Sequence, residues 1–263
     1  MEAALRFGVF FVIFAVMASW EWWKPLRQPR LARIRRWPIN LGLAALNTVL
    51  LRITLGSAAW SAAQTASAYG FGLFNLFRLP EIPTGLLSLL CLDCAIYAQH
   101  VAAHRWQWFW QLHQVHHSDL DFDTTTALRF HPFEIVLSMI YKVLVTALLG
   151  VPPAAVVVFE IVLNGCALFN HGNVSLPAAW EKLLRQLLVT PALHRIHHSS
   201  LRSETDSNYG FCLSCWDRCF GTLCTKASLP AAEITIGLSE LRDPHRLSFF
   251  RLIVLPFHFK RKF

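Results

Sequence analysis

The sequence is poor in charged residues, which make up 15% of its 263 positions. Soluble domains contain about 25% charged residues on average. Hydrophobic residues account for 54% of the chain. This composition disfavours a soluble globular protein and predicts a membrane protein.

Several motifs of other protein classes are also absent. The chain has no haem-attachment motif, no GxGxxG nucleotide motif, no ferredoxin-like cysteine run and no HExxH zinc motif. Its seven cysteines are odd in number and mostly have apolar neighbours, which argues against a disulfide framework. The cysteines at 212, 215, 219 and 224 match no familiar zinc-finger spacing. Electrons for any redox reaction would therefore have to come from another protein.

Long apolar stretches predict about four to five membrane-spanning helices. A helix of about 20 residues crosses the hydrocarbon core of a bilayer. Residues 61–83 are punctuated by glycine and proline, so we expect an external loop or an interfacial helix there. The short first arm of the last apolar hairpin leaves a re-entrant pair possible. The expected spans are residues 5–23, 39–60 and 84–103, followed by a hairpin of residues 134–149 and 154–170.

The net charge of +8 could suggest nucleic-acid binding in a soluble protein. The basic residues instead gather beside apolar stretches, at positions 24–36 and 260–262. Positive charge beside a span marks the cytoplasmic side of a membrane protein. We therefore expect no nucleic-acid partner. We also expect residues 24–38 to be cytoplasmic, with Pro25, Pro29 and Pro38 breaking any helix there.

Eight of the twelve histidines fall into three clusters with helical spacing. Side chains at positions i, i+3 and i+4 share one face of a helix and can converge on a metal ion. Imidazole suits iron, zinc, copper and nickel, and one ion takes at most about six ligands, so eight nitrogens favour two ions. The clusters are His100 and His104; His113, His116 and His117; and His194, His197 and His198.

These clusters resemble the three histidine boxes of the fatty acid hydroxylase and sterol desaturase superfamily of membrane di-iron oxygenases. The boxes read His100-x3-His104, His113-x2-His116-His117 and His194-x2-His197-His198. The segment from Glu204 to Thr222 and the segment from Arg129 to Glu134 are also similar to family segments in the same places. The resemblance covers about residues 85–225 and is most specific over the boxes.

The resemblance implies two iron ions held by the boxes, dioxygen as co-substrate and a C–H bond of a lipid as the target, such as a fatty acyl chain or a sterol. Side chains alone cannot attack an unactivated C–H bond, so a redox metal must carry that step. Hydroxylation and desaturation share the removal of hydrogen, and the family favours hydroxylation. An external electron donor is implied as a partner, either a ferredoxin or a cytochrome with its reductase.

Two further histidines are candidate ligands by the same resemblance. His171 is similar to a further family histidine, and its alternative is a helix-end side chain that bonds a backbone carbonyl. His131 precedes a proline and could be a ligand, a partner of a ligand or a structural residue. His245 and His258 lie outside the resemblance and are left out.

Metal-bound imidazoles usually donate their other ring nitrogen to a carboxylate or carbonyl oxygen. Asp206 is the first candidate for that role, with Glu134, Asp93 and Asp217 behind it. Asn208 and Tyr209 are expected to shape the loop under the site. The alternative for residues 206–210 is only a polar turn, because these residue types favour turns.

A polar run from Ser118 to Thr126 contains Asp119, Asp121 and Asp123. It lacks the glycine at the sixth position and the glutamate at the twelfth position of an EF-hand loop. We therefore expect a solvated loop.

The expected fold is an all-α integral membrane helical bundle with a cytoplasmic helical cap that carries a histidine-rich site for two metals. Because every box falls on the side marked by the basic run, the site is expected to face the cytoplasm of a bacterial inner membrane. The expected parts are spans and a loop in residues 1–83, a catalytic domain similar to the family in 84–225, and a cytoplasmic tail in 226–263.

Two alternatives remain open at this point. A membrane zinc hydrolase would use the imidazoles to activate water, although it needs fewer histidines and usually a carboxylate. A metal transporter or other metal-binding membrane protein would spread its ligands at mid-span, whereas these clusters lie at the ends of spans.

Overall fold

The computed structural model describes residues 2–258, which form helices joined by turns and loops. Within this range there are two isolated β-bridges and no β-strand, so the all-α expectation is confirmed. The basic residues Lys260, Arg261 and Lys262, which were expected to mark the cytoplasmic side, lie outside the described residues.

Long helices make up the first two thirds of the chain, and short helices follow. The first set is α1 (Glu2–Trp23), α2 (Arg33–Thr54), α3 (Ala58–Ala68), α4 (Leu73–Leu76), α5 (Glu81–Arg105), α6 (Gln107–His117), the 3-10 helix η1 (Thr124–Leu128), α7 (Pro132–Leu149) and α8 (Pro153–Asn170). The second set is α9 (Ala178–Leu184), α10 (Pro191–His197), α11 (Arg202–Thr205), α12 (Cys215–Cys219), the 3-10 helix η2 (Pro244–Leu247) and α13 (Phe249–His258).

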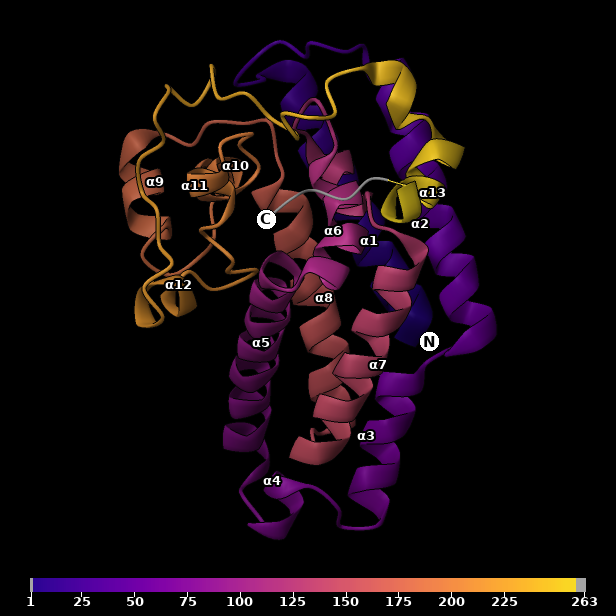
Figure 1. Ribbon diagram of the computed structural model, residues 1–263. Helices are drawn as coiled ribbons and strands as arrows, with labels where there is room; N and C mark the ends of the chain where they lie inside the picture. The colour runs from indigo at the N-terminus through magenta and orange to yellow at the C-terminus, as the bar shows by residue number, and fades with distance from the viewer. Residues whose placement is uncertain (1, 259–263) are drawn as a thin grey trace.

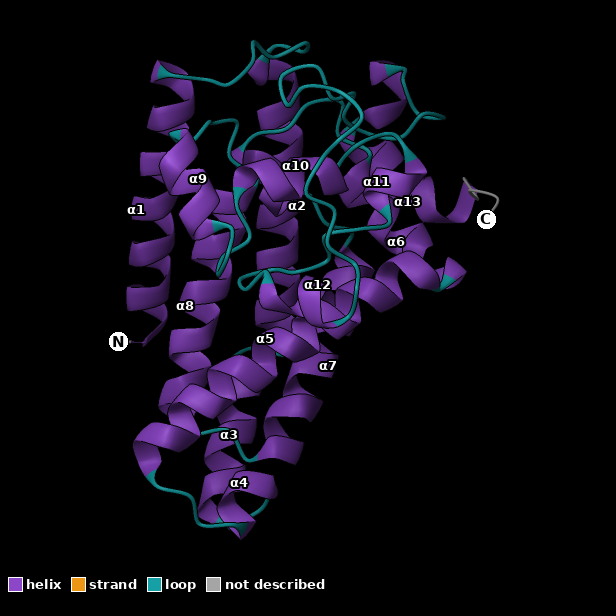
Figure 2. Ribbon diagram, turned by 90° about the vertical axis from the view of Figure 1, so that its left-hand side faces the viewer, coloured by secondary structure: helices purple, strands orange, loops and turns teal. Residues whose placement is uncertain are grey.

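The two sets occupy different ends of the molecule. Figure 1 shows α3, α5, α7 and α8 running lengthwise, with α4 at one end and the short helices α9 to α12 beside the other. Figure 2 shows that most loops gather at the end that carries the short helices. The molecule therefore has a helical bundle at one end and a loop-rich cap at the other.

In the part of the chain that the structure describes, five segments are long and apolar enough to cross a membrane, in agreement with the predicted four to five spans. They are Ala4–Trp23, Arg33–Leu76, Glu81–Arg105, Pro132–Leu149 and Pro153–Asn170. The second differs from the expected span at residues 39–60. Helix α2 already begins at Arg33, and α3 and α4 continue through residues that we expected to form an external loop or an interfacial helix.

Contrary to expectation, Pro38 does not break the helix. It lies inside α2, close to the start of that helix. A proline near the beginning of a helix removes one backbone hydrogen bond but leaves the following turns intact.

The bundle packs through small residues of α3. Ala59 and Ala63 are buried against Val156 and Phe159 of α8 and Leu92 of α5. Small side chains let helices approach closely, which is a common source of association between membrane helices. This packing holds α5 and α8, which both lead into the cap, in a fixed relation to each other.

The acidic run is not a solvated loop, because Asp119, Asp121 and Asp123 are all buried. Arg36 of α2 donates to both carboxylate oxygens of Asp119 at 2.7 Å each and to Asp123 at 2.6 Å. Arg27 contacts Asp121 at 3.3 Å. From the sequence, we expected these arginines to mark the cytoplasmic side of the membrane and these aspartates to lie in a solvated loop. They instead neutralise one another inside the protein, as buried charges require.

Another buried arginine fixes the end of α6. The guanidinium of Arg129 donates to the Val115 carbonyl oxygen and to the Ser118 hydroxyl at 3.0 Å each. It also donates to the side-chain oxygen of Asn40 in α2 at 2.9 Å. The carbonyl groups at a helix C-terminus have no partners within the helix, and Arg129 satisfies one of them. The last turn of α6, which carries two histidines, is thereby tied to α2.

Helix α13 packs back onto the rest of the protein. Leu252 and Leu255 are buried in one cluster with Leu43 of α2 and Trp110 of α6. The opposite face exposes Phe250 and Phe257. The C-terminal segment therefore covers α2 and α6 up to His258.

Candidate metal centre

Four helices bring nine histidines to one place at the boundary between the bundle and the cap. Helix α5 supplies two of them near its C-terminus, α6 supplies three, and α10 and its C-cap residue supply three more. The C-cap residue of α8 supplies the ninth. The predicted spacings lie on helices, as expected from the i, i+3 and i+4 pattern. All nine residues are buried, and His100, at 7% exposure, is the most accessible.

The nine histidines divide into two groups. Within each group one possible ligand atom per residue lies within 4.8 Å of those of all the other members. The first group is His100, His104, His113, His117 and His197, and the second is His116, His171, His194 and His198. Each of the three sequence clusters contributes to the first group, and residue pairs that are adjacent in sequence are split between the groups. A helix turns by about 100° per residue, which directs neighbouring side chains to different centres.

The first group has the unsatisfied nitrogens that a metal ion would need. The Nε2 atoms of all five histidines are buried without a hydrogen-bond partner among the described residues. A buried polar atom without a partner costs about 1 to 3 kcal/mol. Five such atoms in one cluster fit a shared cation better than they fit a packed core.

The ligand atoms of the second group also lie close together. Nε2 of His171 lies 3.2 Å from Nε2 of His116 and 3.1 Å from Nε2 of His194. Both ring nitrogens of His198 are buried and have no hydrogen-bond partner within residues 2–258. Metal–nitrogen bonds of about 2.0 to 2.1 Å bring ligand nitrogens of one ion to separations of this size. The donor set is all imidazole, which suits iron, zinc, copper or nickel.

The other ring nitrogens of four histidines contact oxygen atoms, which sets their orientation. Nδ1 of His113 lies 2.6 Å from the Glu134 carboxylate. The remaining three contact backbone carbonyl oxygens: His100 with Tyr209 at 2.8 Å, His171 with Ala167 at 2.8 Å, and His197 with Ser207 at 2.7 Å. A proton on Nδ1 leaves Nε2 with a free lone pair, which is the tautomer that a metal ion binds.

Burial keeps these imidazoles neutral. It lowers the pKa of His171 to about 4 and the pKa of His197 to about 3. It also lowers the pKa values of His116, His117, His194 and His198 well below their ordinary value, with neighbouring histidines adding to the effect. A neutral imidazole can bind a metal ion near pH 7 without first losing a proton.

The structure places Asp206 next to the first group but with partial solvent access. Its Oδ1 atom lies 3.5 Å from Nδ1 of His104, and its Oδ2 atom accepts from Nε of Arg202 at 3.0 Å. Glu134, which sequence reasoning ranked behind Asp206, makes the shorter contact with a histidine.

Asn208 and Tyr209 form more than a polar turn. Asn208 has a positive φ of 52° and donates to the carbonyl oxygens of Leu193 and Cys224 at 3.0 Å and 2.8 Å. Tyr209 offers its carbonyl oxygen to His100, and burial raises the pKa of its hydroxyl to about 12. Both residues therefore hold the segment after the third box under the histidines.

Asp217 and Asp93 fix the same segment from two sides. Asp217 accepts from the backbone N–H groups of Tyr209 and Gly210 at 2.8 Å each. Asp93 of α5 accepts from the backbone N–H groups of Cys212 and Leu213 and from the Trp216 indole. These carboxylates hold the loop rather than a histidine.

His131 lies outside both groups. Its Nδ1 atom accepts from the Phe133 backbone N–H at 3.1 Å, as the N-cap of α7, and its Nε2 atom contacts the Ile253 carbonyl oxygen at 3.0 Å. Both ring nitrogens thus have backbone partners, and the residue connects α7 to α13.

Several neighbours of the centre had no recognisable signal in the sequence. Phe130 stacks on His116 with ring centroids 4.4 Å apart. Trp110 packs against His104 at 5.0 Å and against His117 at 5.4 Å. The carbonyl oxygens of Ala167 and Ser207 are backbone atoms, which no residue pattern can reveal.

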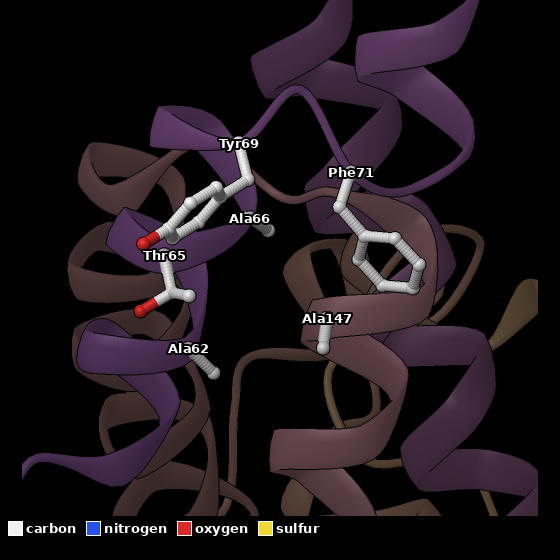
Figure 3. A pocket seen from close by; sticks show the side chains of 6 residues that line it. All are labelled: Ala62, Thr65, Ala66, Tyr69, Phe71 and Ala147. Carbon is white, nitrogen blue, oxygen red and sulfur yellow. The ribbon is translucent and has the colours of Figure 1, made fainter.

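An apolar groove of about 510 Å³ lies elsewhere, between α3 and α7. Figure 3 shows Tyr69 and Phe71 at its rim, with Ala66 and Ala147 lining opposite walls. Its lining residues include none of the nine histidines, and it lies towards the α4 end of the bundle.

Residues 85–222 match the model of the fatty acid hydroxylase family. The chain is 31% identical to an alkylglycerol monooxygenase of Xenopus tropicalis over 84% of its own length and 47% of that protein. It is 30% identical to the ornithine lipid hydroxylase OlsE of Rhizobium tropici over 52% of its own length and 40% of that protein.

A third relative, a cholesterol 25-hydroxylase of Rattus norvegicus, is 26% identical over 52% of this chain and 46% of its own length. The chain thus spans somewhat less than half the length of each of these relatives. No solved structure gives a significant match.

Proposed function

The chain belongs to the fatty acid hydroxylase family, and on that premise we propose that it is a membrane-bound, iron-dependent oxygenase that uses dioxygen to hydroxylate a C–H bond of a lipid. The observation that carries this proposal is the pair of buried imidazole groups, five histidines in one and four in the other, whose ligand atoms converge. Two ions per chain follow from two groups.

The proposed ligands of one iron are His100, His104, His113, His117 and His197, and those of the other are His116, His171, His194 and His198. When bound, the two irons would supply the redox chemistry that activates dioxygen and removes hydrogen from an unactivated C–H bond. His131 is not among the proposed ligands, because backbone groups occupy both of its ring nitrogens.

The protein's own residues prepare the site for that chemistry. Glu134 and three backbone carbonyl oxygens hold the Nδ1 protons of four histidines and thereby aim the Nε2 atoms at the metal. Phe130 and Trp110 cover the imidazoles with apolar surface, which excludes water from the centre. Asp206 would orient His104, while Asn208 and Tyr209 would hold the loop beneath it.

The substrate class follows from the setting and from the relatives. Five apolar segments long enough to span a bilayer support an integral membrane protein. The relatives are named for reactions on alkylglycerols, ornithine lipids and cholesterol, which are all lipids or lipid-like molecules. We infer a lipid substrate for this chain and hydroxylation in preference to desaturation, because all three names describe hydroxylases or monooxygenases.

We infer the orientation of the chain in the membrane from its exposed basic residues. Arg27 and Arg36 are buried, but Lys24, Arg30 and Arg35 remain exposed between the end of α1 and the start of α2. This part of the chain lies at the same end of the molecule as the cap, which supports a site that faces the cytoplasm of a bacterial inner membrane. Electrons would then come from a cytoplasmic carrier protein, a ferredoxin or a cytochrome with its reductase.

Metal analysis of the detergent-purified chain tests the proposal. His197→Ala removes a ligand from the first group and His198→Ala removes one from the second, so each should lower the iron content below that of the wild type. The double variant His245→Ala, His258→Ala is the matched control, because both residues are exposed and lie outside the two groups.

About two irons per chain in the wild type and in the control, with loss in the ligand variants, supports the proposal. Lipids from cells that express the wild type should then gain oxygen from isotopically labelled dioxygen, and lipids from cells with the ligand variants should not. Zinc in protein prepared with iron available would favour the hydrolase alternative. Metal that survives both ligand variants would overturn the ligand assignment.

A further inference from the structure

The histidine centre lies close to solvent at Asp206. Among the groups that contact the second ring nitrogens of these histidines, Glu134, Tyr209, Ser207 and Ala167 belong to buried residues. The side chain of Asp206 is 30% exposed, and it lies 3.5 Å from Nδ1 of His104. A molecule that binds at the surface beside Asp206 is therefore separated from His104, a proposed iron ligand, by the side chain of Asp206.

One arginine contacts this carboxylate, and a second follows its histidine partner in the sequence. Arg202 donates to Asp206 at 3.0 Å and has a side chain that is 48% exposed. Arg105 is exposed and directly follows His104, the histidine that Asp206 contacts. The nearby carboxylate of Glu204 turns away, towards the backbone N–H and hydroxyl of Ser228. Two guanidinium groups against one carboxylate give the surface a net positive charge.

Apolar side chains adjoin these arginines in the sequence. Trp106 follows Arg105 and is 55% exposed, and Leu201 precedes Arg202 and is 46% exposed. Arginine and tryptophan are enriched in protein–protein interfaces, where an apolar centre is bordered by charge. We refer to Arg105, Trp106, Leu201, Arg202 and Asp206 together as the Asp206 surface.

The proposed reaction needs an electron supply at this centre. Hydroxylation converts R–H, dioxygen, two electrons and two protons into R–OH and water, so two molecules of a one-electron carrier are oxidised per turnover. The chain contains none of the usual haem, nucleotide or iron–sulfur motifs. Because electron transfer slows steeply with distance, the carrier must dock close to the histidines.

We propose that the Asp206 surface docks a soluble one-electron carrier protein with an acidic face. The inference rests on the proposed oxygenase function, and it adds the place and the charge of the partner. Opposite charges on the two surfaces increase the association rate and make it depend on salt.

Binding of a purified acidic [2Fe–2S] ferredoxin tests this inference. The full chain, reconstituted in a bilayer disc of zwitterionic lipid, is titrated with ferredoxin in iron-loaded and metal-free form. Arg105→Gln and Arg202→Gln should each weaken binding by about threefold to fivefold, as expected for one exposed charge pair. The double variant should also reduce the salt dependence of the dissociation constant. Arg246→Gln, which removes an exposed arginine from η2, is the control and should bind as the wild type does.

Equal loss in Arg246→Gln, or no loss in the double variant, would show that the ferredoxin binds elsewhere and would overturn the inference. It would also fail if the wild type did not bind ferredoxin, or if the arginines affected only association with anionic lipid discs. A thermal melt of each variant separates lost binding from lost folding. Since binding is measured without turnover, a negative result leaves the iron and oxygen tests of the proposed function unaffected.

Discussion

Nδ1 of His113 lies 2.6 Å from Oε1 of Glu134, and both side chains are buried. The histidine comes from α6 and the glutamate from the first turn of α7, so the contact joins the second histidine box to the helical hairpin of α7 and α8. A carboxylate in this position fixes the tautomer of the imidazole and raises its basicity as a ligand.

Removal of this carboxylate should weaken metal binding without removing a ligand. Glu134→Ala is expected to lower iron affinity by about 10-fold to 100-fold, as is typical for partners of metal-bound histidines. Competition with a chelator of known affinity measures the change. Glu233→Ala, which removes an exposed carboxylate, is the control and should leave the affinity unaltered. Equal affinity in Glu134→Ala and wild type would contradict the role assigned to Glu134.

The histidine centre was the most predictable part of the molecule. The helical spacing predicted which side chains lie near one another, and the structure gathers them in one region. It does not send each triplet to one ion, because the i and i+4 members of a box lie in one group and the i+3 member lies in the other. The partners of the histidines were less predictable, since Glu134 is distant from the boxes in sequence and the other contacts are backbone carbonyls. Their positions depend on how α7 and the loop after α10 pack, which residue spacing does not specify.

The first eighty residues contribute more than membrane spans. Arg27, Arg36 and Asn40 come from the region around the start of α2, and they hold the loop that joins α6 to α7. Local charge patterning could not predict this, because each half of the network looks like ordinary surface charge when its partner is some eighty residues away.

Loss of Arg36 should strongly destabilise the protein. Arg36→Met would leave Asp119 and Asp123 without their main counter-charge in a buried setting, at a cost of about 3 to 5 kcal/mol. Thermal unfolding followed by circular dichroism in detergent would show a lower midpoint and a reduced yield of folded protein. The neighbouring Arg35→Met is the matched control, since Arg35 is exposed and should tolerate the change. Equal midpoints for the two variants would show that the buried network contributes little.

Acid should destabilise the metal-free protein before it affects most carboxylates. His171 and His197 have pKa values of about 4 and about 3 in the folded protein, whereas unfolded histidine titrates near 6.5. Between these values the unfolded chain binds more protons than the folded one, so stability rises with pH across this window and is lost as the pH falls. Each such histidine should contribute a slope of about 1.4 kcal/mol per pH unit below pH 6.

Melting temperatures of the metal-free protein between pH 7.5 and pH 4.5 measure this effect. The midpoint should fall steadily below about pH 6.5, and His171→Asn should reduce the steepness of the fall. A midpoint that stays constant down to about pH 5 would contradict the burial of neutral histidines.

Asn208 contributes to the stability of the protein through its backbone conformation and through its side-chain hydrogen bonds, and two substitutions can separate these contributions. Its backbone has a φ of 52°, in the left-handed region that asparagine and glycine tolerate better than other residues. Its side chain also donates to the Leu193 and Cys224 carbonyl oxygens and accepts from the Cys224 N–H at 2.7 Å. Asn208→Gly should lose only the side-chain bonds, whereas Asn208→Ala should lose those bonds and also strain the backbone by about 1 kcal/mol. The alanine variant should therefore unfold at lower urea concentration than the glycine variant. If the glycine variant unfolded at the lower urea concentration, the flexibility of glycine in the unfolded chain would outweigh the backbone strain. The left-handed conformation would then not be the reason for an asparagine at position 208.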